Sequence, residues 1–181
     1  MSGDAARWVL GAVILLAVAA LFVAMARTWR TRSRRQAEAV PPVPVPAAPG
    51  AVLGSWDGFT VATTRADEPL ERITAGGLGF RGRGGVTVHE HGVVLRLAGA
   101  DDRWVAAAAV RGADRATAAI DRVVEPGGLV RLRWTATGAA AATDLDTYFR
   151  FPEGDAAALH ALQELATAHE HPQTAGEGTN S

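Results

Sequence analysis

The chain of 181 residues contains no cysteine and no lysine, and all 18 of its basic residues are arginine. Without cysteine, the protein has no disulfide framework, no zinc–thiolate site and no thiol that a lipid could acylate. Without lysine, Schiff-base catalysis and a P-loop lysine are both excluded. These two absences remove several classes of enzyme and metalloprotein before any motif is considered.

Nucleophilic and metal-binding side chains are also scarce. The serines lie only at the termini, the basic segment and the start of the predicted domain: Ser2, Ser33, Ser55 and Ser181. His89 and His91 have the spacing of two ligands on one strand, and His169 and His171 repeat it, but zinc needs three or four ligands. Asp144 and Asp146 form a carboxylate pair that we expect to face Arg131 or Arg133 across strands. We therefore expect no catalytic residue, no metal and no cofactor.

The charges are unevenly distributed along the chain. Residues 1–35 carry six arginines against Asp4, whereas residues 51–181 carry twelve arginines against seventeen acids, a balance of −5. Nucleic-acid-binding domains normally present a basic face, so the acidic balance argues against such a partner. The basic charge belongs to the N-terminal segment, where it can bind anionic lipid headgroups.

An uncharged apolar run extends over the nineteen residues from Trp8 to Ala26. As a helix it would be about 28 Å long, close to the thickness of a bilayer core. Trp8 and Trp29 stand at its two ends, where indole rings favour the headgroup layer. The run predicts a single transmembrane helix over residues 8–28.

The flanking arginines predict the orientation of this helix. Five basic residues follow the run: Arg27, Arg30, Arg32, Arg34 and Arg35. Arginine-rich flanks stay in the cytoplasm, so residues 1–7 should be extracytoplasmic and the remainder cytoplasmic. A cleaved signal peptide is the alternative, since small-residue sites occur at 17–19 and 24–26. Because a signal peptide carries its basic cluster before the apolar run, the order found here favours an anchor.

Residues 29–50 combine this basic membrane edge with a proline-rich linker. Five prolines between Gln36 and Gly50 favour extended polyproline II, which predicts a semi-rigid spacer between bilayer and domain. A PxxP-type ligand for a partner is the alternative.

Residues 51–170 read mainly as short β-strands followed by one helix. Strands are expected at 59–64, 86–88, 93–97, 103–110, 129–135 and 143–151. The segment 156–168 has an apolar stripe around Leu159, Leu162 and Leu165, and Asp155 is a suitable N-cap. The fold class is therefore mainly β: an open barrel of six or seven antiparallel strands capped by the C-terminal helix. Residues 171–181 should be a disordered tail.

This order of elements resembles a pleckstrin-homology-like (PH-like) domain. The segments that carry the resemblance are 78–82, the strand before Gly92, Trp134 and 145–150. Together with the anchor they resemble small single-pass membrane proteins of high-GC Gram-positive bacteria, which are sometimes labelled transporter or export protein. One helix cannot form a translocation path, so we set the transporter label aside. The resemblance implies no catalytic residue.

A glycine-rich segment at 76–85 is the one candidate binding motif. It contains the letters GxGxxG, but the dinucleotide motif requires a following helix, and here a strand follows. We expect a loop between strands, with Arg81 and Arg83 projecting together toward a phosphate or lipid headgroup, or a solvated loop without a ligand.

Two functional hypotheses follow. The first is a non-enzymatic adaptor or scaffold, tethered to the cell membrane, which binds a protein partner. The second is a lipid-headgroup or small-anion binding module that uses Arg81 and Arg83. The acidic balance of the domain favours the first, and the sequence leaves the oligomeric state open.

The arginine asymmetry makes the topology testable. A reporter fused after Ser181 should behave as cytoplasmic in intact cells, because the basic flank stays on that side. Fluorescence and alkaline-phosphatase fusions at the same position measure this. Phosphatase activity at that end would reverse the predicted orientation.

Overall fold

A computed structural model describes residues 3–66, 68, 70–116, 118–119, 122–123, 128–139 and 141–170. The chain divides into two compact units, Met1–Arg35 and Gln36–Ser181. The second unit begins earlier than residue 51, where the sequence places the start of the domain. The predicted tail at 171–181 lies outside the described residues.

The N-terminal unit consists of the helix α1 (Gly3–Ala39), which runs on into the second unit. In the described part of the chain it is the one helix long and apolar enough to cross a membrane. Trp8 and Trp29 are both exposed on it, as are Arg27, Arg30, Arg34 and Arg35, whereas the side chain of Arg32 lies outside the description. The helix continues well past the predicted end at residue 28. No glycine or proline interrupts residues 29–39, so the basic flank is helical and Pro41 comes only after the helix has ended.

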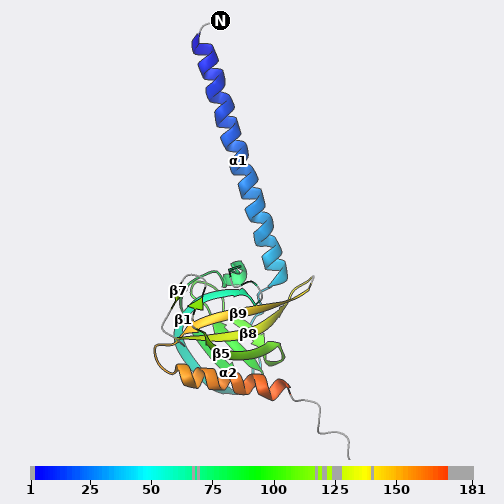
Figure 1. The fold of residues 1–181 in the computed structure, drawn as a ribbon. Helices are drawn as coiled ribbons and strands as arrows, with labels where there is room; N and C mark the ends of the chain where they lie inside the picture. The colour runs from blue at the N-terminus through cyan, green and yellow to red at the C-terminus, as the bar shows by residue number, and fades with distance from the viewer. Residues whose placement is uncertain are drawn as a thin grey trace, which may run out of the picture. The chain divides into compact units, whose positions relative to one another are not determined.

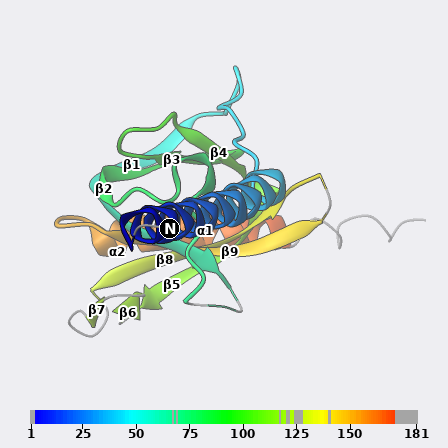
Figure 2. The ribbon, with the colours of Figure 1, turned by 90° about the horizontal axis from the view of Figure 1, so that it is seen from above.

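The second unit is built on one antiparallel sheet of seven strands, where six or seven were predicted, in the order β4-β3-β2-β1-β9-β8-β5. Figure 1 labels β1, β9, β8 and β5 of this sheet. The strands are β1 (Val52–Arg65), β2 (Gly82–His89), β3 (Gly92–Arg96), β4 (Arg103–Ala106), β5 (Val110–Ala116), β8 (Leu129–Thr137) and β9 (Ala142–Arg150). A separate pair, β6 (Ala118–Ala119) and β7 (Arg122–Val123), forms a small second sheet. Figure 2 shows β1–β4 on one side of the domain and β9, β8 and β5 on the other, so the sheet is rolled into an open barrel.

Alternating side chains fill the barrel. On β8, Val130, Leu132 and Trp134 are buried in the core, while Arg131 and Arg133 point to the other face, as the sequence predicted. The indole Nε1 of Trp134 donates a hydrogen bond of 2.9 Å to Thr147 Oγ1 on β9. The buried indole therefore keeps a polar partner inside the apolar core.

The C-terminal helix α2 (Asp155–Glu170) packs against β5, β1, β8, β2 and the short helix η2 (Ala107–Ala109). Its residues Ala158, Leu162 and Leu165 are buried in the core, which confirms the predicted apolar stripe. The Arg115 guanidinium, 2.6 Å from the Asp155 carboxylate, lowers the pKa of that carboxyl at the start of the helix.

Two predicted elements differ in the structure. The strand expected at 103–110 splits into β4, η2 and β5, because the alanine run 106–109 lacks the β-branched side chains that favour a strand. Only the first part of the loop expected at 76–85 is a loop. It begins with a short turn, η1 (Ala75–Gly77), and a strand starts at Gly82. At Gly84, a Cβ would lie 2.3 Å from Arg96 O on the neighbouring strand, so the absence of a side chain permits this pairing.

The proline-rich segment, which the sequence predicts to be a semi-rigid spacer, is docked on the domain. Val40 is fully buried, and Gln36 Oε1 accepts hydrogen bonds from the backbone N–H and the hydroxyl of Thr74 at 3.3 and 3.0 Å. The following residues 41–50, here called the strap, run along β4 and the β2–β3 hairpin. Trp104 N–H donates to Val43 O at 2.8 Å, and His91 N–H donates to Pro49 O at 3.3 Å.

Arg103 on β4 fastens the strap from inside. Its residue exposure is 2%, and its guanidinium donates to Pro41 O at 2.9 Å and to Gly76 O at 3.3 Å. Burial lowers the pKa of Arg103 to about 10, so the group remains charged at neutral pH. The guanidinium also lies 5.9 Å from the ring centroid of Trp134.

The packing of α2 gives a stability prediction. Leu162→Asp in a fragment starting at Gln36 should lower the free energy of unfolding by on the order of 3 kcal/mol or more, because an unpaired carboxylate would be buried. Chemical denaturation followed by circular dichroism measures the change. Ala157→Asp on the exposed side of the same helix is the matched control and should change little. Equal curves for the two variants would show that α2 does not pack on the sheet.

Candidate functional site

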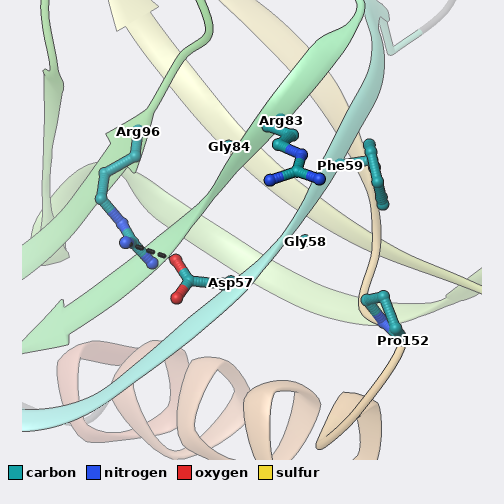
Figure 3. A pocket seen from close by; sticks show the side chains of 7 residues that line it. All are labelled: Asp57, Gly58, Phe59, Arg83, Gly84, Arg96 and Pro152. Atoms are coloured by element: carbon teal, nitrogen blue, oxygen red, sulfur yellow. Dashed lines mark hydrogen bonds and ion pairs between the residues drawn. The ribbon is translucent and has the colours of Figure 1, made fainter.

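An open pocket of about 570 Å³ lies on the outer face of the sheet (Figure 3). Strands β1, β2 and β3 and the residue that begins the turn after Phe151 supply its wall. The lining residues are Asp57, Gly58, Phe59, Arg83, Gly84, Arg96 and Pro152.

Strand alternation places these side chains outside the barrel. On β2, Val86 and Val88 face the core, so Gly85 and Arg83 face outward. The register sets Arg83 opposite Phe59 and Gly85 opposite Asp57. It also sets Gly85 opposite Arg96 on β3, so the side chains of three strands meet on one face.

Asp57 and Arg96 form an ion pair across this face. Arg96 Nη1 lies 2.6 Å from Asp57 Oδ1, and Nη2 donates to Trp56 O at 2.9 Å. The Arg96 side chain passes over Gly85, where a Cβ would come within 2.7 Å of Nη2. Glycine at 85 thus leaves the space that Arg96 needs, and the pairing neutralises the charge of Arg96 inside the pocket.

Arg83 is the unpaired cation of the pocket. Within the described part of the chain, it has no ion-pair or hydrogen-bond partner, and Figure 3 shows it between the Arg96–Asp57 pair and Phe59. Phe59 is 42% exposed, so its ring is accessible beside Arg83. The register sets Phe59 between Arg83 on β2 and the exposed Arg150 on β9. The pocket therefore combines an exposed aromatic ring with the positive charge of Arg83, and Arg150 lies next to it on the same face.

Only one of the two arginines that the sequence grouped lines this pocket. Arg83 lines the pocket, whereas Arg81 is exposed just before β2 and is not among the lining residues. Sequence reasoning missed Asp57, Phe59 and Arg96. Strand alternation could have shown that Phe59 and Asp57 share a face, but only the register shows which side chains of β2 and β3 lie beside them.

Asp144, Asp146 and His89 have structural partners. Arg131 binds Asp114 through two hydrogen bonds of 2.8 and 2.6 Å and lies 3.4 Å from Asp146, as expected for that acid. Burial raises the pKa of Asp146, and the charge of Arg131 opposes this. Asp144 accepts a hydrogen bond from Thr135. His89 is buried, with Nδ1 3.1 Å from Gly50 O and its ring edge-on to Trp104.

Comparison with known proteins agrees with this fold. The model of the family described as "Bacterial PH domain-like" matches residues 37–166. No curated protein matches the chain. The match covers both the docked end of α1 and the whole seven-stranded barrel with most of α2, so the chain is a member of the bacterial PH domain-like family.

Proposed function

We propose that this protein is a non-enzymatic adaptor, anchored by α1 in the cell membrane with its domain in the cytoplasm. PH-like domains generally act as binding modules, and α1 has the length and composition of a membrane span. In this proposal the domain holds a protein partner at the cytoplasmic face of the membrane and needs no cofactor.

The observation that carries the proposal is the composition of the outer pocket. Phe59 and Pro152 supply apolar surface, and Arg83 supplies one free charge beside them. Asp57 neutralises the second guanidinium of the pocket at 2.6 Å. One free cation beside an aromatic ring suits a protein segment with an acidic side chain next to an apolar one. A polyphosphorylated headgroup would require several unpaired cations.

A lipid headgroup or other small anion is the second candidate. One observation supports this candidate: the strand register places Arg83 and Arg150 on either side of Phe59 on the same face. Two arginines with an exposed ring between them resemble a surface that touches anionic lipid. The balance of −5 over residues 51–181 works against such binding.

A photocrosslinker can separate the two candidates. Phe59→benzoylphenylalanine, introduced into the full-length protein in living cells, should crosslink to one discrete protein band. Leu70→benzoylphenylalanine, at a position that is 84% exposed, is the control and should not give that band. Adding Arg83→Ala should reduce the Phe59 crosslink at least about fivefold, a loss of about 1 kcal/mol. Crosslinks to lipid alone would overturn the adaptor proposal.

Vesicle binding tests the charge argument directly. The fragment starting at Gln36 should bind phosphatidylglycerol vesicles weakly or not at all. Asp57→Ala should strengthen binding severalfold by freeing Arg96, while stability changes by less than about 1 kcal/mol because the pair is exposed. Cosedimentation at two salt concentrations measures the effect. Tight binding by the unmodified fragment that Arg83→Ala abolishes would favour the headgroup function.

A further inference from the structure

The strap occupies a groove between β4 and β8. One cavity of about 160 Å³ beside it is lined by strap residues, by Trp104 and Val105 of β4, and by Trp134 to Thr137 of β8. A second cavity of about 500 Å³ is lined by Pro42, Val43 and Pro44 together with Gly76 and residues 100–103. Val43 and Arg103 line both cavities, so the two cavities lie next to each other along the strap.

The domain holds the strap by its backbone carbonyls. Pro41 O accepts from Arg103, and Val43 O accepts from Trp104 N–H. Carbonyl oxygens are available at every position of an extended chain, proline included. These two bonds use no N–H group of the strap, so the groove suits an extended, proline-rich segment in the polyproline II form.

The middle of the strap fills this groove poorly. Residues 42–48 are exposed, and Val43 is 44% exposed, although it lies between the two cavities. Val40 at one end is fully buried. The segment is thus held at its ends and by a few backbone bonds, with little apolar burial that would oppose its replacement.

The groove contains charged groups that the strap leaves without a partner in the described part of the chain. Nε of the buried Arg103 has no hydrogen-bond partner among the described residues. Asp101 and Asp102 are exposed beside Pro44 and have no ion-pair partner in the described part of the chain. A proline-containing segment with a basic side chain next to its prolines would place that charge beside these carboxylates.

We propose that this groove is a second binding site, which takes an extended proline-containing segment of a protein partner, and that residues 41–44 occupy it until that segment displaces them. The groove lies at the β4 edge and shares no lining residue with the outer pocket. The proposal therefore does not depend on the adaptor role of Phe59 and Arg83. Because the strap is covalently attached, it competes at an effective concentration in the millimolar range.

The test uses the full-length protein in detergent and a fluorescent peptide of sequence VPPVPRPAA, which is residues 40–48 with arginine in place of Val45, next to Pro44. Val43→Asp should release the strap, because the new carboxylate lies beside Asp101 and Asp102 and in the apolar cavity. Fluorescence anisotropy should show at least about tenfold tighter peptide binding by this variant than by the unmodified protein. A peptide with glycine in place of each proline should not bind.

A reversible disulfide gives a second test that does not depend on how well the Val43→Asp variant folds. Since the chain has no cysteine, Pro44→Cys combined with Asp102→Cys gives only one possible disulfide, across the 500 Å³ cavity. The oxidised protein, checked by mass, should lose peptide binding, and reduction should restore it. The same affinity in both redox states, or no binding by any variant at millimolar peptide, would overturn the proposal. Self-association that disappears with Val43→Asp would overturn it too, because the occupant would then be a second copy of the chain.

Discussion

The buried guanidinium of Arg103 connects parts of the domain that lie far apart in sequence. Its hydrogen bonds go to the carbonyls of Pro41 and Gly76, and it stands over the ring of Trp134. A charge in this position is costly unless its donors are satisfied, so it needs the η1 turn and a segment, here the strap, that supplies a carbonyl oxygen. Gly76 has φ of 59°, and a Cβ there would collide with Nη2 of Arg103. The backbone conformation at Gly76 and the position of the Arg103 guanidinium therefore depend on each other.

The rest of the architecture follows from how this corner closes the sheet. Strands β4 and β5 are the two edges of the seven-stranded sheet, and only the three residues of η2 separate them in sequence. The strap covers the outer edge of β4, and α2 packs against β5 and η2. With both edges covered in this way, the outer face of β1, β2 and β3 is left open to solvent, and it holds the pocket around Arg83.

Local sequence patterns predicted much of this fold. Alternation in β8, the His89–Gly92 turn and the leucine stripe of α2 were sufficient, because each is a short-range pattern of burial. Such patterns did not predict β5, because Gly112 and Asp114 have low strand propensity. Pairing with β8 outweighs that propensity in the folded domain. The pocket was only partly predictable, since Arg96 reaches Asp57 through the register of three strands. The docking of the strap was not predictable at all, because carbonyl acceptors leave no trace in side-chain identity.

The prolines of the strap also decide what the sheet presents to its surroundings. A bare edge strand exposes N–H and C=O groups that can recruit a further strand, which is a common route to aggregation. Here the chain beyond β4 carries proline at 41, 42, 44, 46 and 49, and none of these residues has an N–H to offer. The strap therefore offers fewer backbone donors to a further strand than a bare edge of β4 would. Any segment that takes its place must be equally poor in backbone donors. Otherwise the domain gains an exposed edge that can pair with a strand of another molecule.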